Sequence, residues 1–169
     1  MPSNKHRVKL ALGLVLAFAG AAAAAETAAV TGMARVIDAD MLEVDGRRII
    51  LFGVDAPERN QPCMLKGKAW DCWAVAAREL EQLVANEPVT CEDAGRPDPF
   101  RRHFAICRIG QTDINEALVR SGMAMAFARQ TKAYLPAQKE AKAARRGLWK
   151  SRFIAPWKWR LQRGAPGAR

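Results

Sequence analysis

The chain has 169 residues and a formal net charge of +10. Beyond its first 25 residues it is long enough for one domain with a core of its own. That part holds one histidine, His103, and two serines, Ser121 and Ser151, with neither a G-x-S-x-G motif nor a glycine-rich nucleotide loop. These features exclude a serine–histidine hydrolase and a P-loop or Rossmann-type nucleotide-binding protein.

The N-terminal segment, residues 1–25, has the pattern of a secretory signal peptide. Residues 5–9 carry three positive charges, residues 10–20 are apolar but too few to span a bilayer, and residues 23–25 are alanines suited to cleavage. We expect a mature protein that begins near Glu26, is exported to the periplasm or secreted, and has no transmembrane segment. A short uncleaved membrane anchor is the alternative interpretation.

The positive charge is concentrated at the two ends of the chain. Residues 150–169 contain six basic residues and no acidic one, whereas residues 26–149 are close to neutral. We therefore predict a domain over residues 26–149, followed by a basic tail over 150–169. Such a tail suits a phosphate backbone or an anionic surface, or it is a solvated extension. Its Trp157 and Trp159 could stack on bases or meet lipid, but packing against the domain is the plainer interpretation.

Three strands are predicted directly after the signal peptide. Residues 31–38 alternate between two faces, which is typical of a strand. Residues 41–44 continue as a second strand, and Asp45-Gly46 is a strong signal for a two-residue hairpin turn. Residues 47–54 then form the third strand of this hairpin-rich region.

The rest of the chain alternates between helical and extended patterns. The expected elements are helices over residues 70–84, about 114–121 and 138–149, and strands over residues 89–93 and 103–109. Asp113 is placed to cap the second helix. Five short strands with about three helices predict an α+β, mainly β fold, namely a five-stranded barrel of the OB type. An α+β sandwich without barrel closure is the competing architecture.

Four cysteines remain in the mature chain, and an even number in an exported protein favours two disulfides. Three pairings are open. We prefer Cys63–Cys72, which closes a short loop, together with Cys91–Cys107, because the latter two residues lie in predicted strands that could pair. A zinc site built from all four thiolates is the alternative, although no C-x-x-C pair occurs.

Acidic residues flank the predicted strands near the hairpin. Asp40 follows a tight bend, Asp55 ends a neighbouring strand, and Glu58 lies three residues further, past the rigid Pro57. Magnesium and calcium take oxygen ligands, so Asp40 and Asp55 could bind one metal ion. Glu58 could hold a water as a general base. This is a phosphodiesterase-like arrangement, and ordinary turn chemistry of aspartates is the alternative.

Five stretches carry a further signal, in order along residues 33–149. They are residues 36–40, 54–58, 98–102, 118–122 and 144–149. In these stretches the chain resembles the staphylococcal nuclease family, whose members are thermonuclease-like proteins with an OB fold. The resemblance implies a phosphodiesterase that depends on calcium and cuts DNA and RNA.

The same resemblance implies roles for individual residues. Asp40 and Asp55 match the metal-binding carboxylates, and the carbonyl of Ala56 matches a further metal ligand. Glu58 matches the acid that positions or deprotonates the attacking water, and Arg102 matches one of two arginines that contact the scissile phosphate. The implied cofactor is Ca²⁺, and the implied partner is DNA or RNA, with single strands favoured. We expect a monomer.

The chain departs from the family pattern within the expected site. Ile50 stands where the second phosphate-binding arginine is expected, and Ala39 and Met41 replace the usual glycine and threonine. Phe100 and Phe127 correspond to two tyrosines beside the nucleotide; they keep a stacking face but lose the hydroxyl. Loss of one preorganised donor typically costs about 10²–10³ in rate. We therefore expect a slowed nuclease.

Arg48 is a candidate substitute for the missing arginine. It lies two residues before Ile50, so strand alternation aims it at the same face, about 6.6 Å along the strand. Two function classes follow. The first is a secreted calcium-dependent nuclease, and the second is a pseudo-nuclease that binds nucleic acid or protein without efficient cleavage. A third is a cell-envelope interaction protein that uses the basic tail.

Overall fold

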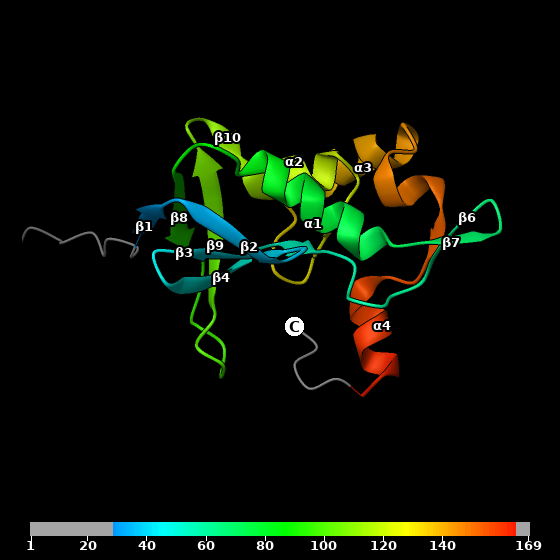
Figure 1. Cartoon of the computed structure of the whole chain (residues 1–169), viewed down its shortest axis with the longest axis horizontal. Coiled ribbons are helices and arrows are strands. Elements are labelled where there is room, and N and C mark those ends of the chain that lie inside the picture. The colour runs from blue at the N-terminus through cyan, green and yellow to red at the C-terminus, as the bar shows by residue number, and fades with distance from the viewer. Residues whose placement is uncertain (1–28, 165–169) are drawn as a thin grey trace, which may run out of the picture.

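The computed structural model describes residues 29–164 (Figure 1). The expected signal peptide, residues 1–25, lies outside these residues. Among the helices between residues 29 and 164, none is both long and apolar enough to cross a membrane.

Most strands belong to one sheet whose order is β1-β8-β9-β4-β3-β2, with β10 paired to β9. These strands are β1 (Ala29–Gly32), β2 (Ala34–Asp38), β3 (Met41–Val44), β4 (Arg47–Leu51), β8 (Val89–Asp93), β9 (His103–Ile109) and β10 (Thr112–Asp113). All neighbours are antiparallel except β4 and β9, which are parallel.

The sheet closes on itself through its first two strands. Only Met33 separates β1 from β2, yet these strands lie at opposite ends of the strand order. One nearly continuous segment therefore pairs with β8 at one end and with β3 at the other, which makes a five-stranded barrel. The α+β fold with an OB-type barrel is confirmed, and the open sandwich is not formed.

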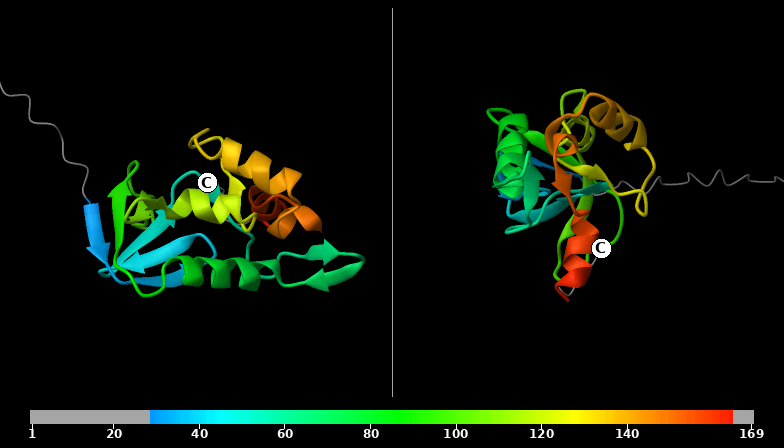
Figure 2. Two further views of the ribbon diagram at one scale, coloured as in Figure 1. Left: turned by 90° about the horizontal axis from the view of Figure 1, so that it is seen from above. Right: turned by 90° about the vertical axis from the view of Figure 1, so that its right-hand side faces the viewer.

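Four helices and two small sheets complete the described chain. The helices are α1 (Cys72–Leu83), α2 (Ile114–Arg120), α3 (Leu135–Ala143) and α4 (Pro156–Gln162), with a 3₁₀ turn η1 (Gly147–Lys150). The small sheets pair β5 (Val54–Asp55) with β11 (Met125–Ala126), and β6 (Cys63–Leu65) with both β7 (Lys68–Trp70) and β12 (Arg152–Phe153). Figures 1 and 2 show the β6–β7 hairpin projecting at the end of the molecule opposite to β1, while α4 stands apart from the other helices.

One hydrophobic core is shared by the barrel, α1 and α2. Ile49 and Leu51 of β4 belong to it, and both are 0% exposed. The helix expected over residues 70–84 is observed as α1, and its apolar side chains lie in this core or pack against it. Asn115 at the start of α2 is buried and donates to the carbonyls of Phe52 and Ala105, which ties the ends of β4 and β9 to the helix.

The helix expected over residues 138–149 differs from the observed one. It starts earlier, at Leu135, and ends at Ala143, because the chain turns into the left-handed region at Arg145 and Gly147. At Gly147 a side chain would lie 2.4 Å from the carbonyl oxygen of Gly122, so two segments cross there at a distance that only glycine permits. The 3₁₀ turn η1 then begins at Gly147 and runs to Lys150.

Both expected disulfides are present, Cys63–Cys72 and Cys91–Cys107. The second bridges β8 and β9, whose register places Cys91 opposite Cys107. All four cysteines are used in this way, which removes the alternative of a zinc site.

The tail expected over residues 150–169 is folded in its described part. β12 pairs with β6, and Trp157 of α4 packs against Phe127 with ring centroids 5.8 Å apart. Pro156 fixes the first turn of α4, where its missing N–H costs nothing. Folded structure therefore continues past residue 149 and brings α4 to the domain.

Candidate active site

Two expected metal ligands are buried at the ends of short strands. Asp40 follows β2, after an irregular register between Val36 and Asp38, and is 4% exposed. A bulge of this kind re-aims the following side chains. Asp55 ends β5 and is 0% exposed. Oδ2 of Asp40 accepts the backbone N–H of Ala56 at 3.3 Å, so the two strand ends meet in one place.

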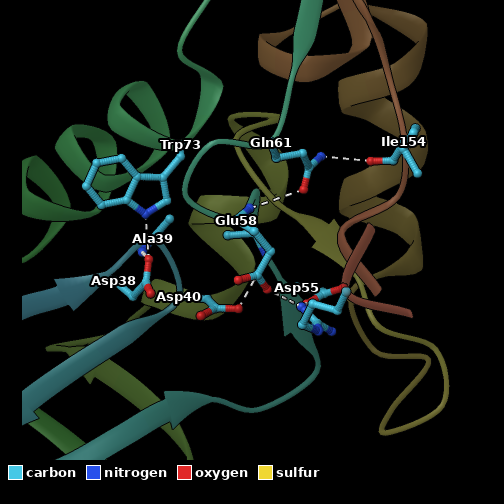
Figure 3. Close-up of polar contacts among 10 residues, drawn as sticks. Asp38, Ala39, Asp40, Asp55, Glu58, Gln61, Trp73 and Ile154 are labelled. Carbon is cyan, nitrogen blue, oxygen red and sulfur yellow. Dashed lines mark hydrogen bonds and ion pairs between the residues drawn. The ribbon is translucent and has the colours of Figure 1, made fainter. Parts of the chain in front are cut away.

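Glu58 is held beside these aspartates by Gln61. The backbone N–H of Glu58 donates to Oε1 of Gln61 at 3.2 Å, and the N–H of Gln61 donates back to the Glu58 carbonyl at 3.0 Å. Nε2 of Gln61 also donates to the carbonyl of Ile154 at 2.8 Å, just before α4. Figure 3 shows the carboxylates of Asp40, Asp55 and Glu58 facing one another, with Gln61 between Glu58 and Ile154. The expected acids are therefore brought together.

Arg160 of α4 is part of this cluster, although sequence reasoning placed it in a tail. Its Nη1 donates to Oδ1 of Asp55 at 2.7 Å and to Oε1 of Glu58. Burial lowers the pKa of Arg160, but the hydrogen bonds and charges of Asp55 and Glu58 outweigh this effect, so the pKa lies above its ordinary value. Arg160 is a fixed positive charge within the acidic cluster.

The signals that point to Arg160 in the sequence are weak. Pro156 opens a stretch without helix breakers that lasts until Gly164, which is consistent with a short helix. The three acids expected to meet, Asp40, Asp55 and Glu58, also favour a nearby cation. Neither signal selects Arg160 among the basic residues of the tail, because its partners lie about a hundred residues away.

The chemistry of the donors is compatible with a hard cation. Asp40 and Asp55 offer buried carboxylates, and the carbonyl of Ala56 is the expected third ligand. Within residues 29–164, no three acidic, histidine or cysteine side chains are grouped so as to hold a metal ion by themselves. Calcium accepts carbonyls and waters in irregular shells, so two carboxylates do not exclude it.

Arg102 is oriented by Asp98. Nε of Arg102 donates to Oδ2 of Asp98 at 2.6 Å, and Oδ1 of Asp98 accepts the backbone N–H groups of Phe100 and Arg102, each at 2.9 Å. Burial raises the pKa of Asp98, but the bonds from Arg102 outweigh it and hold the pKa below its usual value. Phe100 is 63% exposed, and its ring centroid lies 5.4 Å from the guanidinium carbon of Arg102. An oriented arginine therefore adjoins an exposed aromatic ring.

Ile50 and Arg48 lie on the face of β4 that points away from the core side chains Ile49 and Leu51. Ile50 is 0% exposed, whereas Arg48 is exposed and lines a pocket of about 370 Å³ with Arg47, Phe100, Arg101 and His103 among others. The cation that contacts Asp55 and Glu58 through hydrogen bonds is instead Arg160.

Phe127 differs from the expected stacking residue. It is 4% exposed and its ring packs against Trp157. A ring enclosed in this way presents little surface for a nucleotide base. Among the two expected aromatic residues, Phe100 is the one at the surface.

Comparisons with known proteins identify the family. The family model described as "Staphylococcal nuclease homologue" matches residues 48–151. The chain is 37% identical over 126 residues to the "Succinoglycan biosynthesis protein ExoI" of Rhizobium meliloti, which covers 72% of this chain and 65% of that protein. It is 31% identical over 118 residues to an "Uncharacterized endonuclease" of Haemophilus influenzae, covering 68% of this chain and 61% of the relative.

The chain thus spans less than two thirds of the length of either relative. The family match covers more than half of the chain and includes Asp55, Glu58 and Arg102, whereas Arg160 lies beyond it. The OB barrel agrees with this match. The chain belongs to the staphylococcal nuclease family.

Proposed function

We propose that this protein is an exported, calcium-dependent phosphodiesterase that cuts DNA or RNA, with single strands favoured. The observation that carries the proposal is the convergence of Asp40 with Asp55 and Glu58 from a separate segment of the sequence: two buried aspartates lie beside a partly buried glutamate. Ordinary turn chemistry would leave such aspartates at the surface. The two disulfides suit an oxidising compartment and support the expected export.

Each side chain has a role in this reaction. Asp40, Asp55 and the carbonyl of Ala56 would hold the metal. Bound calcium would supply positive charge beside the scissile phosphate. Glu58, fixed by Gln61, accepts a proton from the attacking water. Arg102, oriented by Asp98, donates hydrogen bonds to the phosphate oxygens, and charge spreading over these oxygens makes such donors effective.

The first prediction tests this role of Glu58. Cleavage of a fluorescently labelled single-stranded oligonucleotide is measured with calcium and with a chelator. We expect chelator-sensitive cutting, and Glu58→Gln should lower its rate by about 10²–10⁴ because the general base is lost. Glu81→Gln, an exposed residue on α1, removes the same charge away from the site and should leave the rate unchanged.

Two results would contradict the proposal. Cutting that survives in Glu58→Gln would assign the activity to another residue or to a contaminating enzyme. Cutting that persists with the chelator would exclude the metal-dependent reaction.

A second candidate is a pseudo-nuclease that binds nucleic acid without cutting it. It is favoured by the buried Ile50 at the position of a catalytic cation and by the ion pairs that Arg160 makes with Asp55 and Glu58. This function predicts that the wild-type protein binds the oligonucleotide in the presence of calcium but leaves it intact.

A further inference from the structure

We propose that Arg160 of α4 is the second phosphate-binding cation of the site, supplied from beyond the part of the chain that the family match covers. The proposal rests on the proposed function and extends it to a residue that no family position assigns. The role is that of a catalytic residue in direct contact with the scissile phosphodiester.

The donors of Arg160 carry this inference. Its side chain is only 9% exposed. Nη1 is used by Asp55 and Glu58, whereas Nε and Nη2 are buried and have no hydrogen-bond partner among residues 29–164. Buried donors are normally satisfied, and those that are not call for a ligand. A guanidinium fork with two such donors matches the two non-bridging oxygens of a phosphodiester.

A pocket beside Arg160 offers room for the substrate. It has a volume of about 200 Å³ and is lined by Glu58, Arg59, Trp159, Arg160 and Arg163. Three of these five side chains are arginines, and the general base borders the same space. A phosphate bound there would lie next to Glu58, and positive charge with an aromatic ring suits the flanking nucleotide.

The surroundings hold Arg160 and Arg59 in place. The guanidinium carbon of Arg59 stacks 3.7 Å from the ring centroid of Trp73, and Nε1 of Trp73 donates to Asp38 at 2.5 Å. On the other side, the bond from Gln61 to the carbonyl of Ile154 fixes the segment that enters α4. A donor fixed before the substrate arrives stabilises developing charge without reorganisation.

Arg160 fits the missing role better than Arg48 does. Arg48 lies at the surface of β4 and lines a pocket with Phe100 and His103. Arg160 contacts Glu58 directly, so a phosphate on its fork lies within reach of the water that Glu58 activates. Arg160 on α4 thus supplies the positive charge that the apolar Ile50 on β4 does not provide.

The hydrolysis leaves the protonation state and the covalent structure of Arg160 unchanged. The oxygen of water forms a bond to phosphorus, and one ester P–O bond breaks. The proton of the water passes to Glu58, and the leaving oxygen takes a proton from solvent. Arg160 donates hydrogen bonds to the non-bridging oxygens throughout, and these bonds strengthen as negative charge gathers on them.

The experiment compares Arg160→Ala and Arg160→Lys with Lys158→Ala in the full chain. Lys158 is an exposed residue of the same helix, so its substitution removes one positive charge outside the pocket. Two quantities are measured: the rate of oligonucleotide cleavage with calcium, and the dissociation constant of a short oligothymidylate in chelator, by fluorescence anisotropy. Thermal melting establishes that each variant is folded.

We expect Arg160→Ala to lower the cleavage rate by about 10²–10³ and to weaken binding at least about 10-fold. Arg160→Lys keeps the charge beside Asp55 and Glu58 but loses the fork, so it should fold and still cleave at least about 10-fold more slowly. Lys158→Ala should match the wild type in both measurements. If Arg160→Ala fails to fold, Arg160→Lys decides the question.

The proposal would be overturned if folded Arg160→Ala cleaved and bound the oligonucleotide as well as the wild type does. If Arg160→Ala does not fold, the same result in Arg160→Lys would overturn it. Faster cleavage in Arg160→Ala would also overturn it, because Arg160 would then be an inhibitory occupant of the metal position. A wild-type protein that cuts nothing would sink the proposed function but not this inference. Oligothymidylate binding would then test the role of Arg160. If neither Arg160→Lys nor Arg160→Ala changes the dissociation constant, Arg160 does not contact the phosphate.

Discussion

Single side chains set the charge of this site. Of the ion pairs in the described residues, Asp55–Arg160 is the most deeply buried, with side chains 0% and 9% exposed. A buried pair of this kind stabilises little in total, but removing one partner leaves a charge that is costly to bury. The pKa of Arg160 is raised above an already high value, so its charge persists throughout the pH range in which the protein would work. The site is permanently electropositive at this one position.

Asp98 provides the second prediction, at the scale of one carboxylate. The pKa of Asp98 is lower in the folded protein than in the unfolded chain, where it is about 3.9. The ionised carboxylate therefore stabilises the fold at pH values above the unfolded-state pKa. This stabilisation is lost as the pH falls through the folded-state pKa. Asp98→Asn should therefore lower the free energy of unfolding by about 1 kcal/mol at neutral pH. The difference from the wild type should shrink below about pH 4, where the carboxylate takes up a proton.

Urea unfolding at neutral and acid pH measures this difference. Asp98 is a positioning residue, so Asp98→Asn should also weaken oligonucleotide binding through a less ordered Arg102. Asp45→Asn, in the exposed hairpin turn, removes the same charge and should change neither quantity, because asparagine tolerates the left-handed conformation of that residue. A stability difference that stays constant down to acid pH would contradict the assigned role.

At the scale of elements, a chain of contacts connects α4 to the barrel. β12 directly precedes α4 and pairs with β6, and the disulfide Cys63–Cys72 ties β6 to the start of α1. Gln61 adds the bond between the Glu58 turn and Ile154. The position of Arg160 therefore depends on the short β6–β12 pairing rather than on the barrel alone.

The third prediction separates the two disulfides by this connection. Replacing both members of Cys63–Cys72 by alanine should cost about 2.5 kcal/mol in the loop-entropy model, and replacing Cys91–Cys107 about 3 kcal/mol. Only the loss of Cys63–Cys72 removes a link from the chain of contacts that connects α4 to the barrel. This variant alone should therefore weaken oligonucleotide binding, measured at a temperature where both variants are folded. Equal losses of binding in the two variants would show that the disulfide does not position α4.

The elements also show what local sequence can predict. Residues 41–44, 89–93 and 103–109 were expected as strands with the observed bounds, because alternation and turn residues act over a few positions. The end of α3 was misplaced, since the close crossing of Gly122 and Gly147 is a tertiary contact. α4 was missed because seven residues with two tryptophans and two basic residues resemble a basic tail.

The same distinction holds for the site. Asp40, Asp55 and Glu58 follow predicted strands, so their proximity could be inferred from the hairpin that joins those strands. Arg160 meets Asp55 only because α4 folds back across the molecule. No pattern of neighbours in the sequence encodes that meeting, and the cation that pairs with Asp55 and Glu58 therefore became visible only in three dimensions.

At the scale of the whole molecule, charge governs how a polyanion is bound. The chain has 27 basic and 17 acidic residues, and basic side chains of the folded tail line the pocket beside Glu58. Each phosphate neutralised on a single strand releases counterions, so the logarithm of the association constant falls by about 0.7 per contact for each unit in the logarithm of salt concentration. The salt dependence of binding thus counts the phosphate contacts that the protein makes.

Phosphate contacts from Arg102, Arg160 and Arg163 would give a slope of about −2 when the logarithm of the association constant of oligothymidylate in chelator is plotted against the logarithm of salt concentration. This slope corresponds to an affinity about 20-fold lower at about 200 mM than at about 50 mM salt. Arg160→Ala should reduce the slope by about 0.7, because one phosphate contact disappears, whereas Lys158→Ala should leave it unchanged. Anisotropy titrations at several salt concentrations measure these slopes. A slope near zero would mean that binding is driven by stacking on aromatic rings instead of by the phosphates. An unchanged slope in Arg160→Ala would mean that Arg160 makes no phosphate contact and that other residues bind the phosphates.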